Sequence, residues 1–173
     1  MTSVLLAVGA FVAMEGVSAA AHRMVMHGPG MVWHRSHHVP GAGRFERNDL
    51  FPVCFSAVGV GLFAGATMGP VAALAWVAIG VTAYGAAYLF VHEIAIHRRL
   101  PVRVPVLAYL DWLRDAHRVH HRYGAGPYGM LLPVVSADRR RAARASAESG
   151  VDPLARTRRA SRNRSTRSAR MRL

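Results

Sequence analysis

The ten histidines of the chain fall in two matching sets, and this order limits the fold more than any other feature of the sequence. The pattern His-x-x-His-His stands at residues 34–38 and again at residues 117–121. A wider pair, two histidines five residues apart, precedes each copy, at residues 22–27 and at residues 92–97. Histidines without a shared role would be scattered, so this order predicts two matching halves of one metal site. The predicted ligands are His22, His27, His34, His37, His38, His92, His97, His117, His120 and His121.

Helical geometry explains how such motifs can bind metal. Neutral imidazole is the commonest metal ligand in proteins, and successive helical residues are rotated by about 100°. His34 and His38 are then about 40° apart, while His37 and His38 diverge by about 100°, so one helix can serve two neighbouring ions. The members of a wider pair lie about 140° apart on a straight helix. Either each such pair is divided between two metals, or the helix breaks between its members, as Gly28-Pro29-Gly30 would allow.

Composition and apolar runs point to a membrane. The chain has 173 residues, of which 52% are hydrophobic, and its apolar runs at residues 4–21, 51–68 and 71–91 are each long enough to cross a bilayer. A signal peptide is the alternative for the first run, but Met1-Thr2-Ser3 adds no positive charge to the amino terminus. We expect an all-α integral membrane bundle of about three transmembrane helices, with surface helices that carry the histidine motifs. Residues 106–121 are expected to form one of these, an amphipathic helix near the membrane surface.

Three acidic residues are candidates for support of the metal site. A charge at the middle of a membrane span costs about 2 to 3 kcal/mol, so Glu15 is either a carboxylate beside the metals or an acid near the membrane edge. Asp115 stands two residues before His117, where it either orients that imidazole or is solvated on the helix surface. Glu93 directly follows His92.

Aromatic residues offer a further candidate feature on the third apolar run. Tyr84, Tyr88 and His92 follow one another at a spacing of four residues and share one stripe of a helix. The two tyrosines either pack against a neighbouring helix or form the wall of a substrate site.

The whole chain has a net charge of +13, and its basic residues are concentrated toward the carboxyl-terminal end. All 22 basic residues are arginine, and twelve of them lie in residues 136–173 with only three acids. This segment has no apolar period, so we expect a disordered tail after a membrane domain at residues 1–135. Three spans place the histidine motifs and the tail on one side, which the positive-inside rule assigns to the cytoplasmic face of the cell membrane. Such a tail suits anionic lipid or an acidic electron donor, and nucleic acid is disfavoured because no reader fold is evident.

Several segments resemble bacterial β-carotene 3-hydroxylases of the membrane fatty acid hydroxylase and sterol desaturase superfamily. The resemblance covers roughly residues 10–135 and includes every histidine motif in order. Its further segments are His22 to Gly28, Trp33 to His38, Asn48-Asp49-Leu50 and Thr82-Ala83-Tyr84-Gly85. Two features depart from the family: Glu93 replaces the usual aspartate, and residues 126–130 differ from the stretch that commonly follows the last motif.

The resemblance implies an enzyme with two non-haem iron ions, O₂ as co-substrate and reduced ferredoxin, regenerated by its reductase, as electron donor. It implies a carotenoid substrate taken from the lipid phase and hydroxylated at C3 of each β-ionone ring, from β-carotene through β-cryptoxanthin to zeaxanthin. The ten histidines would then act in catalysis through the metals. Chemistry agrees, because no amino-acid side chain can attack an unactivated C–H bond and a redox cofactor must do so.

Three other classes of protein remain open from the sequence. A fatty acid or sterol hydroxylase or desaturase of the same superfamily would share the metals and differ in substrate. A membrane metal carrier would also need clustered histidines. A di-haem electron-transfer protein would normally hold its ligands within the spans, whereas these motifs lie at or beyond the ends of the apolar runs.

Overall fold

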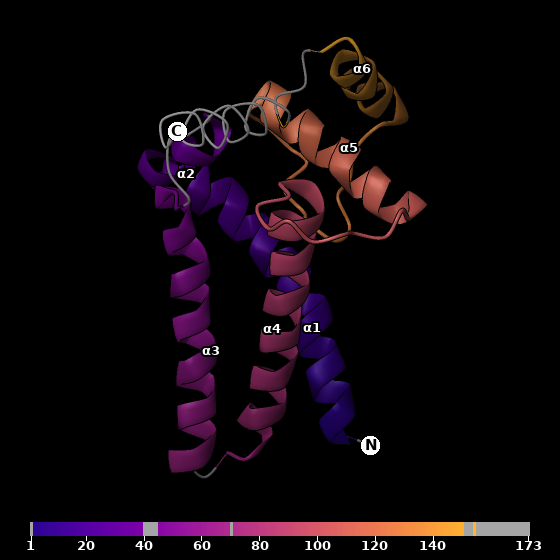
Figure 1. Ribbon diagram of the computed structural model, residues 1–173. Helices are drawn as coiled ribbons and strands as arrows, with labels where there is room; N and C mark the ends of the chain where they lie inside the picture. The colour runs from indigo at the N-terminus through magenta and orange to yellow at the C-terminus, as the bar shows by residue number, and fades with distance from the viewer. Residues whose placement is uncertain (1, 40–44, 70, 151–153, 155–173) are drawn as a thin grey trace, which may run out of the picture.

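The computed structural model describes residues 2–39, 45–69, 71–150 and 154, and every regular element in that part of the chain is helical. Three long helices lie side by side, and three shorter ones gather at one end of them (Figure 1). The amino-terminal end of the first helix lies at the opposite end. The expected all-α architecture is therefore confirmed. The helices are α1 (Thr2–Ala21), α2 (Met31–His38), α3 (Leu50–Met68), α4 (Ala73–Leu89), α5 (Ala108–Tyr123) and α6 (Ala137–Glu148).

Each long helix is extended by a turn of different geometry toward the crowded end. The π-helical segments η1 (His22–Met26) and η3 (Phe90–Ile96) continue α1 and α4, and the 3₁₀ turn η2 (Arg47–Asp49) leads into α3. With these turns the three spans run over Thr2–Met26, Arg47–Met68 and Ala73–Ile96, and each is long and apolar enough to cross a membrane. The three expected spans are thus confirmed, each close to its predicted bounds.

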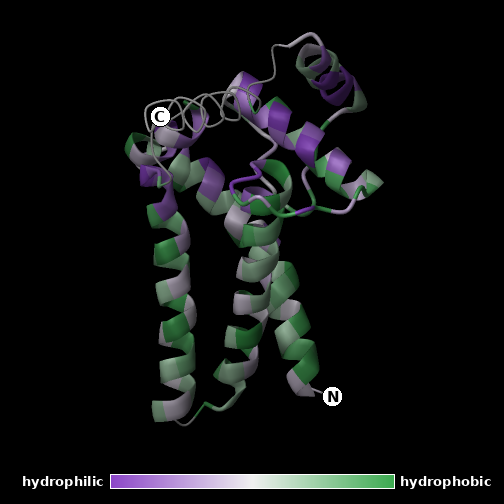
Figure 2. Ribbon diagram, viewed as in Figure 1, coloured by the Kyte–Doolittle hydropathy of each residue, from purple (hydrophilic) through white to green (hydrophobic). Residues whose placement is uncertain are grey.

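The outer surface of the three spans is apolar. Figure 2 shows green, hydrophobic ribbon along α1, α3 and α4 and purple, hydrophilic ribbon in α2, α5 and α6. Leu5, Val60 and Met68 are among many large apolar residues that the fold leaves exposed. Lipid covers such a surface without cost, and the helices satisfy their own backbone hydrogen bonds. The chain is therefore a membrane protein with a polar cap at one end of its spans.

Close packing of α4 against α1 depends on a small residue. A Cβ added at Gly80 would lie 2.2 Å from the Ala7 carbonyl oxygen and 2.8 Å from the Ala10 Cβ. Membrane helices associate through small residues of this kind, since lipid provides no hydrophobic drive between apolar helices. Gly80 therefore sets the distance between two of the three spans.

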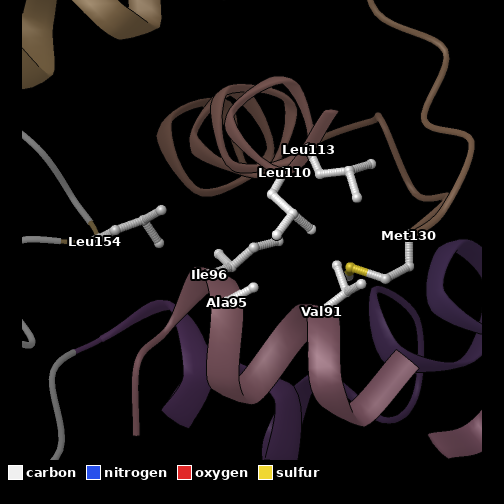
Figure 3. Packing of buried hydrophobic residues seen from close by; sticks show 7 residues of the cluster. All are labelled: Val91, Ala95, Ile96, Leu110, Leu113, Met130 and Leu154. Atoms are coloured by element: carbon white, nitrogen blue, oxygen red, sulfur yellow. The ribbon is translucent and has the colours of Figure 1, made fainter. Parts of the chain in front are cut away.

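The polar cap has its own hydrophobic core. Side chains of η3 interdigitate with those of α5, as Figure 3 shows. The apolar side of α5 therefore contacts protein at Leu110 and Leu113, which are buried against η3. This core docks α5 on the end of α4. Its buried members are Val91, Ala95, Ile96, Leu110, Leu113, Met130 and Leu154.

The expectation of disorder from residue 136 onward is wrong for the first part of the tail, because Ala137–Glu148 is the helix α6. Ser136 caps this helix by accepting a hydrogen bond from the backbone N–H of Arg139. Ala143 is buried, and the Arg140 guanidinium lies 5.9 Å from the ring centroid of Trp112 on α5. Contact with α5 thus orders a segment whose own sequence carries no apolar stripe. Residues 151–153 and 155–173 lie outside the described part of the chain.

Candidate metal centre

Two groups of four imidazoles lie at the polar end of the spans. Within each group one nitrogen of every ring lies within 4.8 Å of the others. The first cluster is His22, His27, His34 and His120. The second cluster is His37, His92, His97 and His117.

The two remaining histidines lie between these clusters. The Nε2 of His38 is 3.1 Å from the Nε2 of His34 in the first cluster. The Nε2 of His121 is 3.1 Å from that of His37 and 2.9 Å from that of His117 in the second. The rings of His38 and His121 stack with centroids 4.6 Å apart. The fold therefore brings together all ten predicted ligands, five around each of two neighbouring positions.

The wider histidine pairs are aligned by the π-helical turns. The backbone N–H of His27 donates to the carbonyl of His22 at 3.0 Å, and His97 donates to His92 at 2.9 Å. These hydrogen bonds span five residues and define a π-helix, so residues five apart come onto one side. Both members of each pair consequently serve the same cluster. The sequence left two alternatives, a histidine pair divided between two metals or a helix broken between the two histidines. The structure has neither, because a widened π-helical turn brings both histidines to one side.

The two shorter helices divide their histidines between the clusters. On α2, His34 belongs to the first cluster and His37 to the second. On α5, His120 belongs to the first and His117 to the second. Each half of the sequence therefore contributes one histidine to the cluster formed mainly by the other half, so each cluster needs residues from both halves.

Outer ring nitrogens of the first cluster are held by neutral oxygen atoms. The Nδ1 of His22 donates to the Tyr128 carbonyl at 3.1 Å, and that of His120 donates to the Ala125 carbonyl at 3.0 Å. The Nδ1 of His34 lies 2.7 Å from Oδ1 of Asn48. A carbonyl oxygen only accepts, so each Nδ1 carries the proton and each Nε2 presents a lone pair inward.

Those inward lone pairs face one another. The Nε2 atoms of His22 and His34 are 3.1 Å apart, and those of His27 and His120 are 3.2 Å apart. In His22 and His34 the Nδ1 atoms hold the protons, so the lone pairs on the two Nε2 atoms repel each other. A cation between the Nε2 atoms removes this repulsion. The donor set therefore fits a transition-metal ion that prefers imidazole.

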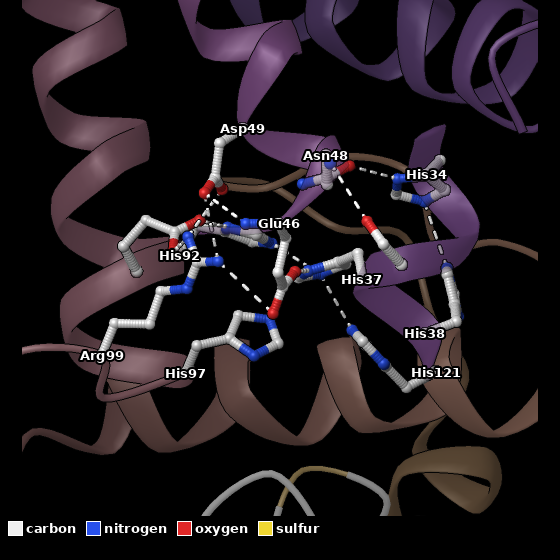
Figure 4. A network of polar contacts seen from close by, with 12 residues as sticks. His34, His37, His38, Glu46, Asn48, Asp49, His92, His97, Arg99 and His121 are labelled. Carbon is white, nitrogen blue, oxygen red and sulfur yellow. Dashed lines mark hydrogen bonds and ion pairs between the residues drawn. The ribbon is translucent and has the colours of Figure 1, made fainter. Parts of the chain in front are cut away.

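Carboxylates replace neutral oxygens around the second cluster. Glu93 Oε1 lies 2.6 Å from the Nδ1 of His92, and Glu46 Oε2 lies 3.5 Å from the Nδ1 of His37. Arg99 joins three carboxylates, with distances of 3.3 Å to Glu46, 2.7 Å to Asp49 and 2.9 Å to Glu93. Figure 4 shows Arg99 between Glu46 and Asp49, beside the imidazoles of His37 and His92.

The sequence patterns did not single out Glu46 or Arg99, and they did not identify Asn48 as the partner of a histidine. A signal was present, since two carboxylates and an amide fall within residues 46–49, directly before a span. That segment forms the short capping turn η2, in which Glu46 and Asp49 bond to each other's backbone N–H. The turn places Asn48 under α2 and Glu46 beside His37.

Burial keeps histidines of α2 and α5 neutral. Loss of solvent lowers the pKa of His34 and of His38 to about 4. Burial, reinforced by neighbouring imidazoles, lowers the pKa of His37 and of His117 well below the usual 6.5. At neutral pH these rings therefore carry no charge, which is the form that binds metal.

The three candidate supporting acids have different surroundings. Glu93 contacts His92 as described, whereas Glu15 accepts hydrogen bonds from the Tyr84 hydroxyl at 2.7 Å and from the backbone N–H of Leu132 at 2.8 Å. Asp115 is buried rather than solvated, and it forms an ion pair of 2.6 Å with Arg118, one turn along α5. Glu15 thus supports a loop and a tyrosine in place of a histidine.

An apolar cavity of about 440 Å³ opens between the spans and ends at the metal centre. It runs along α3 from Phe51 to Phe63, which is about 18 Å of helix at 1.5 Å per residue. Tyr84 and Tyr88 both line it, so the two candidate wall residues do face an open volume. Asn48, His92 and Glu93 line its metal end.

Fold and site together define a helical membrane protein with two adjacent histidine clusters, each able to hold a metal ion, at the polar end of its spans. The fatty acid hydroxylase family model matches residues 7–139, and the chain belongs to that family. The histidine clusters of a hydroxylase family fit a non-haem iron centre.

Curated relatives are similar over most of the chain. A protein of Pseudescherichia vulneris named beta-carotene hydroxylase is 42% identical over 139 residues, which cover 78% of each protein. A protein of the same name from Pantoea ananas is 43% identical over 69% of this chain and 71% of its own length. The chloroplastic beta-carotene 3-hydroxylase 1 of Arabidopsis thaliana is 38% identical over 73% of this chain and 43% of its own length. No solved structure matches the chain.

Proposed function

We propose that this protein is a membrane monooxygenase that hydroxylates C3 of the β-ionone rings of carotenoids, converting β-carotene through β-cryptoxanthin to zeaxanthin. The observation that carries the proposal is the position of the apolar cavity, which lies within the spans and ends beside His92 of the second cluster. A substrate that dissolves in lipid can enter such a cavity from the membrane while one end reaches the metals. The names of the similar bacterial proteins supply the substrate class.

The cavity suits a long, apolar substrate with a ring at its end. Its volume of about 440 Å³ is in the range of ligand sites in proteins. Tyr84 and Tyr88 offer aromatic surface near the metal end, where a ring would lie, and Val60 and Phe63 line the part farther along α3. A β-carotene molecule has two equivalent ends, so one site acts on each ring in turn after release and rebinding.

The ten histidines would hold two non-haem iron ions, which when bound supply the oxidising power for an unactivated C–H bond. One atom of O₂ enters the C–H bond, and the other leaves as water with two electrons and two protons. The chain's own contribution is to hold imidazoles such as those of His22, His92 and His120 by their outer nitrogens and to exclude water. His34, His37 and His120 are almost completely buried, which agrees with that role.

We assign the electrons to reduced ferredoxin, an acidic protein regenerated by its reductase. Exposed arginines lie on the two helices that carry the His-x-x-His-His motifs, Arg35 on α2 and Arg122 on α5. Positive charge of this kind attracts an acidic partner and the anionic lipid of the cytoplasmic leaflet. The positive-inside rule accordingly places the histidine clusters and the carboxyl terminus on the cytoplasmic side of the cell membrane.

A fatty acid or sterol hydroxylase is the second candidate. The description of the matching family favours it, and an acyl chain is as apolar as a polyene. The two candidates share the metals and separate only by substrate.

Expression in a host that accumulates β-carotene tests both candidates. Chromatography of the pigments should reveal β-cryptoxanthin and zeaxanthin, with label from ¹⁸O₂ in each new hydroxyl, and a His120→Ala variant should yield neither. Unchanged β-carotene in cells that contain the iron-loaded protein and reductant would reject the carotenoid. Hydroxylated fatty acids in the same cells would then support the second candidate, and label entering from water would reject an oxygenase.

A further inference from the structure

The outer nitrogens of the two clusters have acceptors of different charge. In the first cluster they donate to the carbonyl oxygens of Ala125 and Tyr128 and to the amide oxygen of Asn48, all of which are neutral. In the second cluster the outer nitrogens of His92 and His37 face the carboxylates of Glu93 and Glu46. The ligand atoms themselves are imidazole nitrogens in both, so the difference lies in the groups behind them.

A carboxylate behind a histidine strengthens that histidine as a ligand. It draws the Nδ1 proton toward itself, raises the electron density at Nε2 and fixes the orientation of the ring, and loss of such a partner typically weakens metal binding 10- to 100-fold. The contact of Glu93 with His92 is short, at 2.6 Å, and the Nε2 of His92 lies 3.1 Å from that of His37 on the inner side. Glu46 acts on His37 from a longer distance of 3.5 Å.

The net charge near the second cluster also favours tighter metal binding there. Glu46, Asp49 and Glu93 share the single guanidinium of Arg99, so this network carries an excess of negative charge. The side chains of Glu46 and Glu93 are only 16% and 14% exposed, and water screens them poorly. Negative charge in such surroundings stabilises a nearby cation.

We propose that the two metal positions are unequal: the second cluster binds a divalent ion first and more tightly, and Glu93 and Glu46 are the positioning residues that cause the difference. This inference rests on the proposed dimetal centre and adds an order of occupancy to it. Arg99 has a supporting part, because it holds Glu46 and Asp49 of one segment and Glu93 of another together.

The chain offers a matched pair of substitutions. Glu93→Gln gives His92 a neutral acceptor of the same size, and Asn48→Asp gives His34 in the first cluster a charged one. The first substitution should remove the advantage of the second cluster, and the second should give the first cluster an equivalent partner. Glu93→Asp keeps the charge and should preserve the order. Glu148→Gln on α6, where the side chain is 72% exposed, serves as the control that changes charge far from the rings.

The test is a titration of the full-length protein in detergent, stripped of iron with a chelator, with Co²⁺ followed by its visible absorption. The wild type and Glu148→Gln should bind two ions in two separate steps. Glu93→Gln should weaken the first step 10- to 100-fold, which merges the two, while Asn48→Asp should tighten the second. His97→Ala should abolish the tight step, and His27→Ala the weak one.

Two ions bound with equal affinity in the wild type, or Glu93→Gln leaving both steps in place, would overturn the inference and leave the dimetal centre intact. Loss of the weak step on His97→Ala would also overturn it. A wild-type protein that binds fewer than two ions would instead reject the dimetal centre and the proposed function with it. Should one variant fail to fold by circular dichroism, the order of loss in the two histidine variants still decides the question.

Discussion

The hydroxyl of Tyr84 donates a hydrogen bond of 2.7 Å to Glu15, and this contact joins the wall of the apolar cavity to the loop that supports the first cluster. Glu15 also accepts from the backbone N–H groups of Leu131 and Leu132. A few residues earlier in the same segment, the carbonyls of Ala125 and Tyr128 hold His120 and His22. Glu15, an acidic residue within a membrane span, thereby links the cavity wall to the loop beside the first cluster.

Replacement of Glu15 by alanine should therefore disturb the metal centre from a distance. It leaves the Tyr84 hydroxyl and two backbone N–H groups without their acceptor, at a cost of about 1 to 3 kcal/mol for each buried group. We expect at least a tenfold loss of activity and loss of metal from the first cluster. Metal analysis of the purified protein measures this, with Glu15→Gln, which keeps one acceptor oxygen, as the milder comparison. Full metal content in Glu15→Ala would contradict the linkage.

Alanine substitution of His37, His97 or His120 should abolish hydroxylation and reduce bound iron, while the protein still reaches the membrane. Each ring belongs to a set of inward-facing nitrogens, and its removal opens the coordination of one ion. Pigment analysis, iron determination and membrane fractionation give the three readouts. Arg141→Ala, which removes a highly exposed side chain on α6, is the control. Full turnover by any two of the histidine variants would refute the ligand assignment.

Gly80→Ala should lower the stability of the bundle. The new methyl group would overlap the Ala7 carbonyl of α1, and such overpacking costs about 1 to 3 kcal/mol. A drop in the thermal unfolding midpoint in detergent would report it. Gly9→Ala on the same helix pair meets no atom within 4 Å and should leave the midpoint unchanged. Equal midpoints for the two variants would show that α1 and α4 do not pack at this distance.

Acid should destabilise the iron-free protein between pH 6.5 and about pH 4. Burial lowers the pKa of His34 and of His38 to about 4 in the folded state, whereas the unfolded chain takes up protons near 6.5. In that interval the unfolded state binds more protons than the folded state, so the stability of the fold decreases as the pH falls. Above about pH 7.5 these groups do not affect the stability. Thermal unfolding of chelator-treated protein across this range measures the slope. A protein that gains stability on acidification would exclude neutral, buried imidazoles.

Truncation separates the described part of the tail from the rest. Removal of residues 155–173 should preserve activity, because the histidine motifs, α6 and the buried Leu154 all precede the cut. Removal of residues 137–173 should reduce activity, since it takes away the buried Ala143 and the cation that covers Trp112 on α5. Pigment analysis of both truncations at matched protein levels is the measurement. Inactivity of the shorter deletion would assign the last residues a role in catalysis or in donor docking.

Local sequence was sufficient for the three membrane spans and for the histidines that gather in the two clusters. Apolar runs of transmembrane length report on membrane spans directly, because the bilayer is a uniform solvent that selects for length and apolarity. The order of the histidines likewise indicated a metal site, since a set of identical ligands with a repeated spacing has few other uses.

Tertiary packing decided how those residues combine. An α-helical period of 3.6 residues would point His22 and His27 in different directions, and the π-helical turn brings both into one cluster. His37 and His120 each join the cluster formed mainly by the other half of the sequence. This depends on how α2 and α5 lie across the ends of the spans, and no sequence pattern within either helix predicts that arrangement. Glu15 and Arg99 took their partners from segments that packing brings close, and for Glu15 the partners lie 69 and 117 residues away. Spacing along a chain determines which side chains share one helix face, whereas contacts between distant segments depend on how whole helices pack. That packing alone made two histidine clusters with different supporting groups from one repeated motif.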